Sequence, residues 1–450
     1  MPTSGVSPVA QAERISSMDV LRGAALLGIA LMNILFSGLP LAADFNPKVS
    51  GGTTAINIAL FAIQYVFWDG KMRGIFSMMF GAGSYLLISR AVSRGAGTEA
   101  VEIYYRRTLW LMLFGILHAF LIWHGDILYA YALLGLVLVP FHRATPKALL
   151  ITAGIFIGLM TGDSVYQGIQ FQKHYKLAME AEKAAAAKQK LTDEQKEAKD
   201  SYDEERKYYN PSADDLKKEI GMYSGSYGHL LAERAKVVKR WHSNPFYMGG
   251  WDMFTMMLVG IAFAKTGVLA AERSEKFYLW LLAAGYGVGI PVGAVSFYLA
   301  WLANFEPMQT VFTFSTYQLA RIAMTMGHVA TILLVCKFGL FEGLRNRLAA
   351  VGQTALSNYI LHSLIYGFVF YGYGFGLYNR LQRYELYYVV LGMWCVSLVW
   401  SPLWLKSFRY GPLEWCWRSL TYWKRQPMRH AAELVVEVEA ASELASEPAQ

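Results

Sequence analysis

Ten runs of predominantly apolar residues recur along the 450-residue chain and constrain its fold more than any other feature. A helix that crosses about 30 Å of hydrocarbon needs roughly 20 apolar residues, and it satisfies its own backbone hydrogen bonds. We therefore predict an all-α fold, a polytopic membrane helix bundle with about ten transmembrane helices. The predicted spans are residues 20–41, 72–90, 107–124, 126–142, 147–165, 246–265, 277–302, 310–336, 348–372 and 385–405.

The composition agrees with a membrane protein. Charged residues make up only 16% of the chain, against about 25% in soluble domains. The net charge of +8 comes from short basic clusters between apolar runs, which is typical of the positive-inside rule, so we expect a lipid bilayer and no nucleic acid as partner. The cysteines Cys336, Cys395 and Cys416 have no paired spacing, which predicts neither a disulfide framework nor a thiolate metal site.

The basic clusters also predict the orientation. They lie on one side of the membrane if both termini are cytoplasmic and residues 53–67, too short for a crossing, form an interfacial or re-entrant helix. Residues 19–171 and 243–408 would then be the two halves of the bundle, with residues 1–18 and the basic segment 409–430 in the cytoplasm. An alternative interpretation takes the apolar run ending at Ala43 as a cleaved signal peptide.

Residues 172–242 interrupt the apolar pattern with Lys, Glu and Ala. The stretch from Tyr175 to Tyr209 has no Gly or Pro and favours helix, and Asn210-Pro211 should end it. We predict an extra-cytoplasmic helical hairpin, which is either a solvated insertion or an arm that docks a partner. Residues 431–450 are acidic and rich in Ala, and we predict that they are disordered.

Ionisable side chains inside apolar runs are costly and are therefore candidate functional residues. Asp19 and Arg22 begin the first span on one helix face, where they either anchor the helix entry or form a cytoplasmic anion site. In the second case Arg22, with Arg106 and Arg107, would bind a phosphate, because a guanidinium group donates paired hydrogen bonds. Asn33 lies on nearly the same face as Arg22 and either bonds another helix or faces the same space.

His118 and Asp126 lie around the end of the third span. Asp126 follows a glycine at a helix–helix corner, where it either caps the fourth span or orients His118 as a general base. His124 is six residues from His118, so the two rings do not share a helix face and do not suggest a metal pair. We predict no metal site.

Other polar residues in the spans either line a cavity or form structural pairs. Arg321 and His328 share a face of the eighth span, and Asp252 is a candidate acid for Arg321. Trp68 and Asp69 begin the second span, as an interfacial anchor or as the wall of a polar cleft.

The ninth span contains a further polar pair and a glycine-rich end. Asn358 and His362 are four residues apart and stack on one helix face, which suits either a cavity wall or simple packing. The alternating glycines of residues 371–376 predict that the helix ends there.

Five segments of the chain resemble the YeiB-like family of bacterial inner-membrane proteins, which carry domain of unknown function 418. These are MDVLRGAALLGIALMNILFSG, FSMMFGAGSYLL, RRTLWLMLFGILHAFLIWHGDILYAYALLGL, LSNYILHSLI and GPLEWCWRSLTY. The resemblance covers about residues 13–425 apart from the insertion, and it implies a location in the bacterial inner membrane.

More distantly, the chain is similar to transmembrane acyltransferases typified by heparan-alpha-glucosaminide N-acetyltransferase. Those enzymes use cytoplasmic acetyl-CoA to acetylate a sugar amine on the far side of the membrane. The shared positions are Asp19, Arg22, Gly23, Asn33, and Trp68 with Gly70. The histidine that those enzymes carry just before the Trp-x-Gly is absent, and His118 or His124 would take its place from a neighbouring helix.

The leading hypothesis is therefore a membrane-bound acyltransferase that uses acyl-CoA and a carbohydrate-like acceptor. Arg22, Arg106 and Arg107 would bind the CoA phosphates, and His118, oriented by Asp126, would be the base. Arg321 or Asn33 would stabilise the oxyanion. Two alternatives stay open: a transporter whose route is lined by Arg321, His328 and His362, and a scaffold that docks a partner or a second copy through residues 172–242.

Overall fold

The computed structural model describes residues 15–242, 250–305 and 307–430. These residues form helices joined by short turns, and among them the only strand-like pairing is an isolated bridge between Phe408 and Arg429. The prediction of an all-α helix bundle is thus confirmed. Two predicted segments lie outside the described residues: the tail predicted to be disordered, residues 431–450, and residues 1–14 of the predicted cytoplasmic segment.

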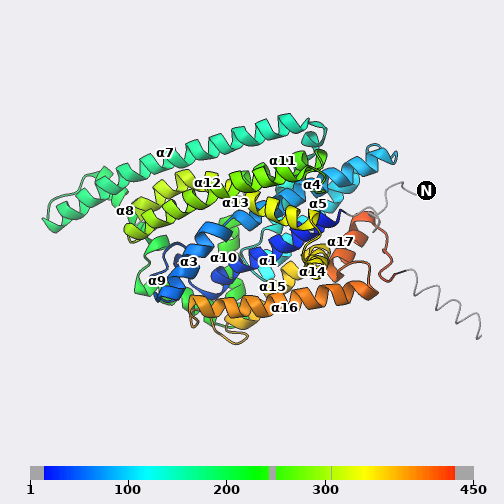
Figure 1. The fold of residues 1–450 in the computed structure, drawn as a ribbon. Helices are drawn as coiled ribbons and strands as arrows, with labels where there is room; N and C mark the ends of the chain where they lie inside the picture. Colours follow the sequence, from blue (N-terminus) through cyan, green and yellow to red (C-terminus); the bar gives the residue numbers. More distant parts are fainter. Residues whose placement is uncertain (1–14, 243–249, 306, 431–450) are drawn as a thin grey trace, which may run out of the picture.

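Helix α1 (Ser16–Gly38) runs through the middle of the bundle (Figure 1). In the most apolar 18-residue stretch of α1, 72% of the residues are buried, whereas the corresponding share in α7 (Pro146–Ala186) is 11%. Neighbouring helices therefore shield α1 from lipid. Its contact with α14 (Glu342–Gln353) is close because two glycines meet there. A β-carbon on Gly23 would lie 2.0 Å from the carbonyl oxygen of Leu348, so only glycine allows this approach.

The segment predicted as an interfacial helix forms α3 (Ala55–Ile63) and a π-helical turn, η2 (Gln64–Trp68). Both continue, after Gly70 in the left-handed region with φ of 69°, into α4 (Lys71–Ser93). Together they make one long apolar stretch, residues 55–93. The π-turn matters for the site because such turns shift the side chains that follow them relative to a regular helix.

Helix α5 (Glu99–Leu121) corresponds to the third predicted span, but the fourth, residues 126–142, is not one continuous helix. It consists of α6 (Leu128–Leu136) and a 3-10 turn, η3 (Val139–Arg143). A helix of nine residues rises only about 14 Å, roughly half the hydrocarbon thickness. Pro140, the second residue of η3, cannot supply the N–H that would continue the α-helix.

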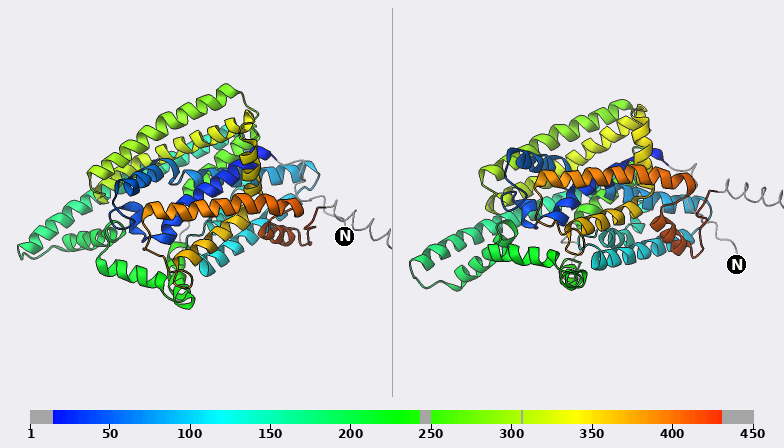
Figure 2. Two further views of the ribbon diagram at one scale, coloured as in Figure 1. Left: turned by 60° about the horizontal axis from the view of Figure 1, so that its bottom comes forward. Right: turned by 90° about the horizontal axis from the view of Figure 1, so that it is seen from below.

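The polar insertion is built on a continuation of the preceding span. Helix α7 extends as a single helix to Ala186, and α8 (Asp193–Tyr209) folds back against it after a capping box at Thr192. The predicted break at Asn210-Pro211 is confirmed, but the uninterrupted helix predicted from Tyr175 to Tyr209 is wrong, because residues 187–192 form the turn between α7 and α8. Helices α9 (Ala213–Ser224) and α10 (Tyr227–His242) follow. Helices α7 and α8 project beyond one end of the bundle (Figures 1 and 2).

The second half of the bundle contains α11 (Trp251–Lys265), α12 (Glu275–Leu302), α13 (Pro307–Lys337), α15 (Ala355–Phe370), α16 (Arg383–Ser407) and α17 (Pro412–Tyr422). Helix α15 ends at Phe370, as the glycines predicted, but Thr354 separates it from α14, so the predicted span 348–372 is two helices. Helix α17 lies at the end of the bundle opposite α8 (Figure 1). Within the described residues, six helical stretches are long and apolar enough to cross a membrane.

Candidate functional site

Two cavities lie along α1, one near each of its ends. The first, of about 260 Å³, is called the arginine cavity here because Arg22, Arg90, Arg94, Arg107 and Arg418 line it. The second, of about 240 Å³, is called the aspartate cavity because Asp69 and Asp126 line it. Asp19 and Arg22 of α1 face the first cavity, and Asn33 of the same helix faces the second.

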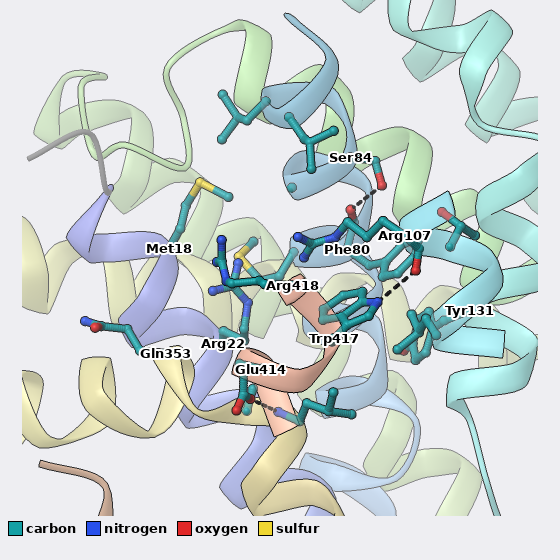
Figure 3. Close-up of a pocket in the computed structure, with 18 of the residues that line it drawn as sticks. Met18, Arg22, Phe80, Ser84, Arg107, Tyr131, Gln353, Glu414, Trp417 and Arg418 are labelled. Carbon is teal, nitrogen blue, oxygen red and sulfur yellow. Dashed lines mark hydrogen bonds between the residues drawn. The ribbon is translucent and has the colours of Figure 1, made fainter. Parts of the chain in front are cut away.

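The arginine cavity combines a charged end with an apolar interior. Figure 3 shows Arg22 of α1, Arg107 of α5 and Arg418 of α17 around the same space. The guanidinium of Arg107 is close enough to the other two for electrostatic repulsion between them. Nη1 of Arg22 donates to Asp19 Oδ1 at 2.7 Å, and the Arg107 guanidinium stacks on Trp417 at 3.9 Å. Cations gathered from three elements with few acids between them favour an anionic ligand.

Of the three arginines predicted to bind phosphates, the structure brings two to this cavity. Arg106 points away, stacks on Trp423 at 3.8 Å and donates to the carbonyl oxygen of Thr421 at 3.1 Å. Arg418 was missed as a ligand residue because it lies far along the chain, in α17. Its only sequence signal is its spacing of four residues from Glu414, which also lines the cavity.

His118 and Asp126 form a buried hydrogen-bonded pair. Their side chains are 2.9 Å apart between Nδ1 and Oδ1, and both are fully shielded from solvent. Asp126 Oδ2 also accepts the backbone N–H of Tyr129 at 2.8 Å, so both predicted contacts of Asp126 are present. A carboxylate at Nδ1 assigns the proton to that nitrogen and leaves a lone pair on Nε2, which has no partner among the described residues.

The corner between α5 and α6 carries this pair and separates the two cavities. Asp126 and Ile127 line the aspartate cavity, whereas Leu128 and Tyr131 line the arginine cavity. Tyr359 of α15 closes the corner from the other side: its ring centroid lies 5.0 Å from that of His118, and its hydroxyl accepts the Ile127 N–H at 3.2 Å. Asp126 therefore lies in the wall between the cavities, and His118, which is bonded to it, lines neither of them.

The aspartate cavity is lined by polar groups and aromatic rings. Asn33, Asp69, Arg73 and His124 lie beside Trp123, Tyr129 and Tyr317. Arg73 Nη2 donates to Asp252 Oδ2 at 2.8 Å.

Arg321 shares the acid Asp252 with Arg73. It forms an ion pair with the other oxygen of Asp252, as predicted, and donates to Gln318 Oε1. Arg321 and Trp68 line neither cavity.

The remaining predicted site residues lie elsewhere. His328 bridges the Phe67 carbonyl oxygen and the Tyr286 hydroxyl, at 2.8 and 2.9 Å, between η2 and α12. Asn358 bonds Ser401 and His362 bonds Ser397, each at 2.9 Å, so this polar stripe joins α15 to α16. Within the described residues no group of acids, histidines and cysteines is arranged to hold a metal ion.

Fold and cavities together define a helical membrane protein with polar groups buried inside its bundle. A family model described as "Protein of unknown function (DUF418)" matches residues 263–424. The uncharacterised protein YxaH of Bacillus subtilis (strain 168) is 30% identical over 440 residues, which cover 94% of this chain and 98% of YxaH. The uncharacterised protein YeiB of Escherichia coli (strain K12) is 28% identical over 432 residues, covering 91% and 96%.

The chain belongs to the DUF418 family, as the resemblance to YeiB predicted. No solved structure matches it.

Proposed function

We propose that this protein is a membrane-bound acyltransferase that moves an acyl group from acyl-CoA to a carbohydrate-like acceptor across the membrane. The observation that carries the proposal is the His118–Asp126 pair in the wall between two cavities of different character. A neutral imidazole fixed by a carboxylate is suited to take a proton from an acceptor hydroxyl or amine. Because the cavities are separate, transfer requires them to join at this wall.

The arginine cavity suits acyl-CoA. Its five arginines are suited to phosphates, and Phe76, Met79 and Leu111 are among its apolar lining residues. A volume of about 260 Å³ is slightly below the usual range for pockets that enclose a whole ligand, about 300–1,000 Å³. The cavity would therefore hold the acyl-pantetheine arm, with the nucleotide at the surface beside Arg418.

The aspartate cavity suits the acceptor. Asn33 and Asp69 offer an amide and a carboxylate to hydroxyl or amine groups, and Trp123, Tyr129 and Tyr317 offer rings to the faces of a sugar. His124 completes the polar lining beside Asp126.

The proposed orientation follows from the charges. Arg90, Arg94, Arg107 and Arg418 share one end of the bundle, so we place this end and both termini in the cytoplasm of the bacterial inner membrane. Residues 172–242 then lie outside the cell.

The two alternative functions receive less support. A transport route lined by Arg321, His328 and His362 would need these residues to meet in one space. Arg321 instead pairs with Asp252, His328 bonds the Phe67 carbonyl oxygen, and His362 bonds Ser397. The α10 part of the insertion docks on its own bundle, because Arg234 donates to the Leu121 carbonyl oxygen at 2.6 Å. That contact occupies surface which a scaffold would need for a partner.

The test is acyl-CoA binding and turnover by the purified full-length protein. We expect binding of acetyl-, butyryl- or palmitoyl-CoA and release of free CoA when a hexose or hexosamine is added. His118→Ala should lower turnover by about 100-fold or more, since a positioned general base contributes that much, while acyl-CoA still binds. Arg22→Ala should weaken binding instead.

His174→Ala is the matched control, because His174 is exposed on α7, and its turnover should equal that of the wild type. Absence of binding to all three acyl-CoAs would contradict the proposal. Solute flux in proteoliposomes without CoA would support a transporter.

A further inference from the structure

Three of the tyrosines that line the arginine cavity are buried, and the hydroxyls of two of them have acceptors for their protons. Tyr104 donates to the Gly135 carbonyl oxygen at 2.7 Å. Tyr131 (labelled in Figure 3) has the Arg73 carbonyl oxygen at 3.2 Å and Ser77 Oγ at 2.9 Å. These two hydroxyls therefore already form hydrogen bonds within the protein.

Tyr359 differs from the other two. Its oxygen accepts the Ile127 N–H, but among the described residues its own hydrogen has no acceptor. The side chain is 3% exposed and lines the arginine cavity. A buried O–H group without an acceptor costs free energy, so a ligand atom that accepts its hydrogen bond is bound more favourably.

Tyr359 is also the cavity residue that contacts the proposed base. Its ring centroid lies 5.0 Å from that of His118, and the N–H that it accepts belongs to Ile127, the neighbour of Asp126. The hydroxyl is thus held at the point where an acyl group in the arginine cavity would meet the His118–Asp126 pair.

We propose that Tyr359 is a catalytic residue whose O–H donates to the carbonyl oxygen of the bound thioester. This inference rests on the proposed function. His118 Nε2 takes the proton of the acceptor hydroxyl or amine, whose oxygen or nitrogen bonds to the thioester carbon. The carbonyl oxygen becomes an oxyanion held by Tyr359. The C–S bond then breaks, the carbonyl re-forms, and the proton on His118 passes to the leaving thiolate to give free CoA.

The assignment replaces the expectation that Arg321 or Asn33 would stabilise the oxyanion. Arg321 is bonded to Asp252 and Gln318 and lines neither cavity, and Asn33 faces the aspartate cavity. Neither side chain borders the cavity that would hold the thioester.

The test compares Tyr359→Phe with Tyr366→Phe in the purified full-length protein. Tyr366 is a matched control: it lies on the same helix, is buried, and donates one hydrogen bond to the Ala30 carbonyl oxygen at 2.9 Å, but it lines neither cavity. We expect Tyr359→Phe to lower kcat by about 100-fold with little change in KM for acyl-CoA. Tyr366→Phe should keep the wild-type kcat.

A second readout reports the hydrogen bond itself. Infrared spectra of acyl-CoA labelled with 13C at the carbonyl should show a lower stretching frequency when bound to the wild type than when free in water. The shift should be lost in Tyr359→Phe and kept in Tyr366→Phe.

An unshifted band on the wild type would overturn the assignment, as would equal losses of kcat in the two variants or none in Tyr359→Phe. A wild type without any acyl-CoA turnover would overturn the proposed function, and this inference with it.

Discussion

Asp252 illustrates how a single acid holds the charged core of this bundle together. Its two oxygens pair with Arg73 of α4 and Arg321 of α13, and its side chain is 5% exposed. Removing one partner from a buried ion network leaves uncompensated charge, which is far costlier than replacing the whole network. The acid therefore links α4, α11 and α13 through charge.

Asp252→Asn should consequently destabilise the protein by about 3 kcal/mol, because the buried Arg321 guanidinium and the half-buried Arg73 guanidinium lose their counter-charge. Thermal unfolding in detergent, followed by tryptophan fluorescence, measures the change. Asp163→Asn, at an exposed position on α7, is the control and should leave the Tm unchanged. A Tm for Asp252→Asn equal to that of the control would show that the network contributes little.

A second residue-scale feature is the carboxyl of Asp44, in the loop helix α2 (Ala42–Phe45). Burial and the neighbouring Asp69 carboxylate raise the pKa of Asp44 to about 7, whereas Arg383 and a hydrogen bond from Gln64 act in the opposite direction. In the unfolded chain the pKa of this carboxyl is about 3.9. The folded state binds this proton more tightly than the unfolded chain does. The contribution of Asp44 to the free energy of unfolding is therefore complete below about pH 4 and is lost as the pH rises through 7.

We therefore expect the Tm of the wild type to fall between about pH 4 and 7, and that of Asp44→Asn, which mimics the neutral acid, to change less. Melting curves at several pH values test this expectation. Parallel curves for the two proteins would refute the assignment to Asp44.

At the scale of elements, α9 and α10 are fastened to the end of the bundle by aromatic stacking and buried hydrogen bonds. The ring of Tyr223 lies 5.1 Å from that of Tyr371 and 4.2 Å from that of Tyr378. Glu219 accepts the Leu41 N–H and the Tyr378 hydroxyl, both at 2.9 Å. Tyr223 also contacts His124, so these helices cover the side of the bundle where the aspartate cavity lies.

Tyr223→Ala should release α9 and α10, because losing a buried aromatic ring costs about 3 kcal/mol or more. Amide hydrogen exchange over residues 213–242 should then become roughly 100-fold faster, while α1 keeps its protection. Lys217→Ala, exposed on α9, is the control. Unchanged exchange in Tyr223→Ala would mean that other contacts hold these helices.

At the scale of the whole molecule, α17 and the insertion lie at opposite ends of the bundle (Figures 1 and 2). The five arginines of the arginine cavity lie toward the α17 end, which we propose to be cytoplasmic on the basis of the positive-inside rule. The two cavities would then belong to opposite sides of the membrane, and the proposed reaction would use substrates from both.

Cysteine labelling tests this orientation. In a background where Cys336, Cys395 and Cys416 are serine, Lys190→Cys should react with a membrane-impermeant maleimide on intact cells. Ser93→Cys, at the exposed C-terminal end of α4, should react only after permeabilisation. The reverse pattern would invert the topology and move the arginine cavity to the outside.

Much of the fold was predictable, because lipid leaves an apolar segment few choices besides a helix. The break at Asn210-Pro211 and the end of α15 at Phe370 follow from local backbone preferences, which the residues themselves carry. The short α6 and the division at Thr354 did not follow, since hydropathy does not distinguish a helix that crosses lipid from one buried in protein.

The sequence by itself determined that the chain forms apolar helices, and it brought His118 and Asp126 together, because eight residues around one helix corner leave them within reach. Only the tertiary structure decided that Arg418 joins Arg22, that Arg106 turns away, that His362 bonds Ser397 and that Tyr359 closes the wall. The reason is physical: a polar side chain in an apolar helix needs a partner, but the packing angles and helix rotations that choose this partner come from contacts between distant segments.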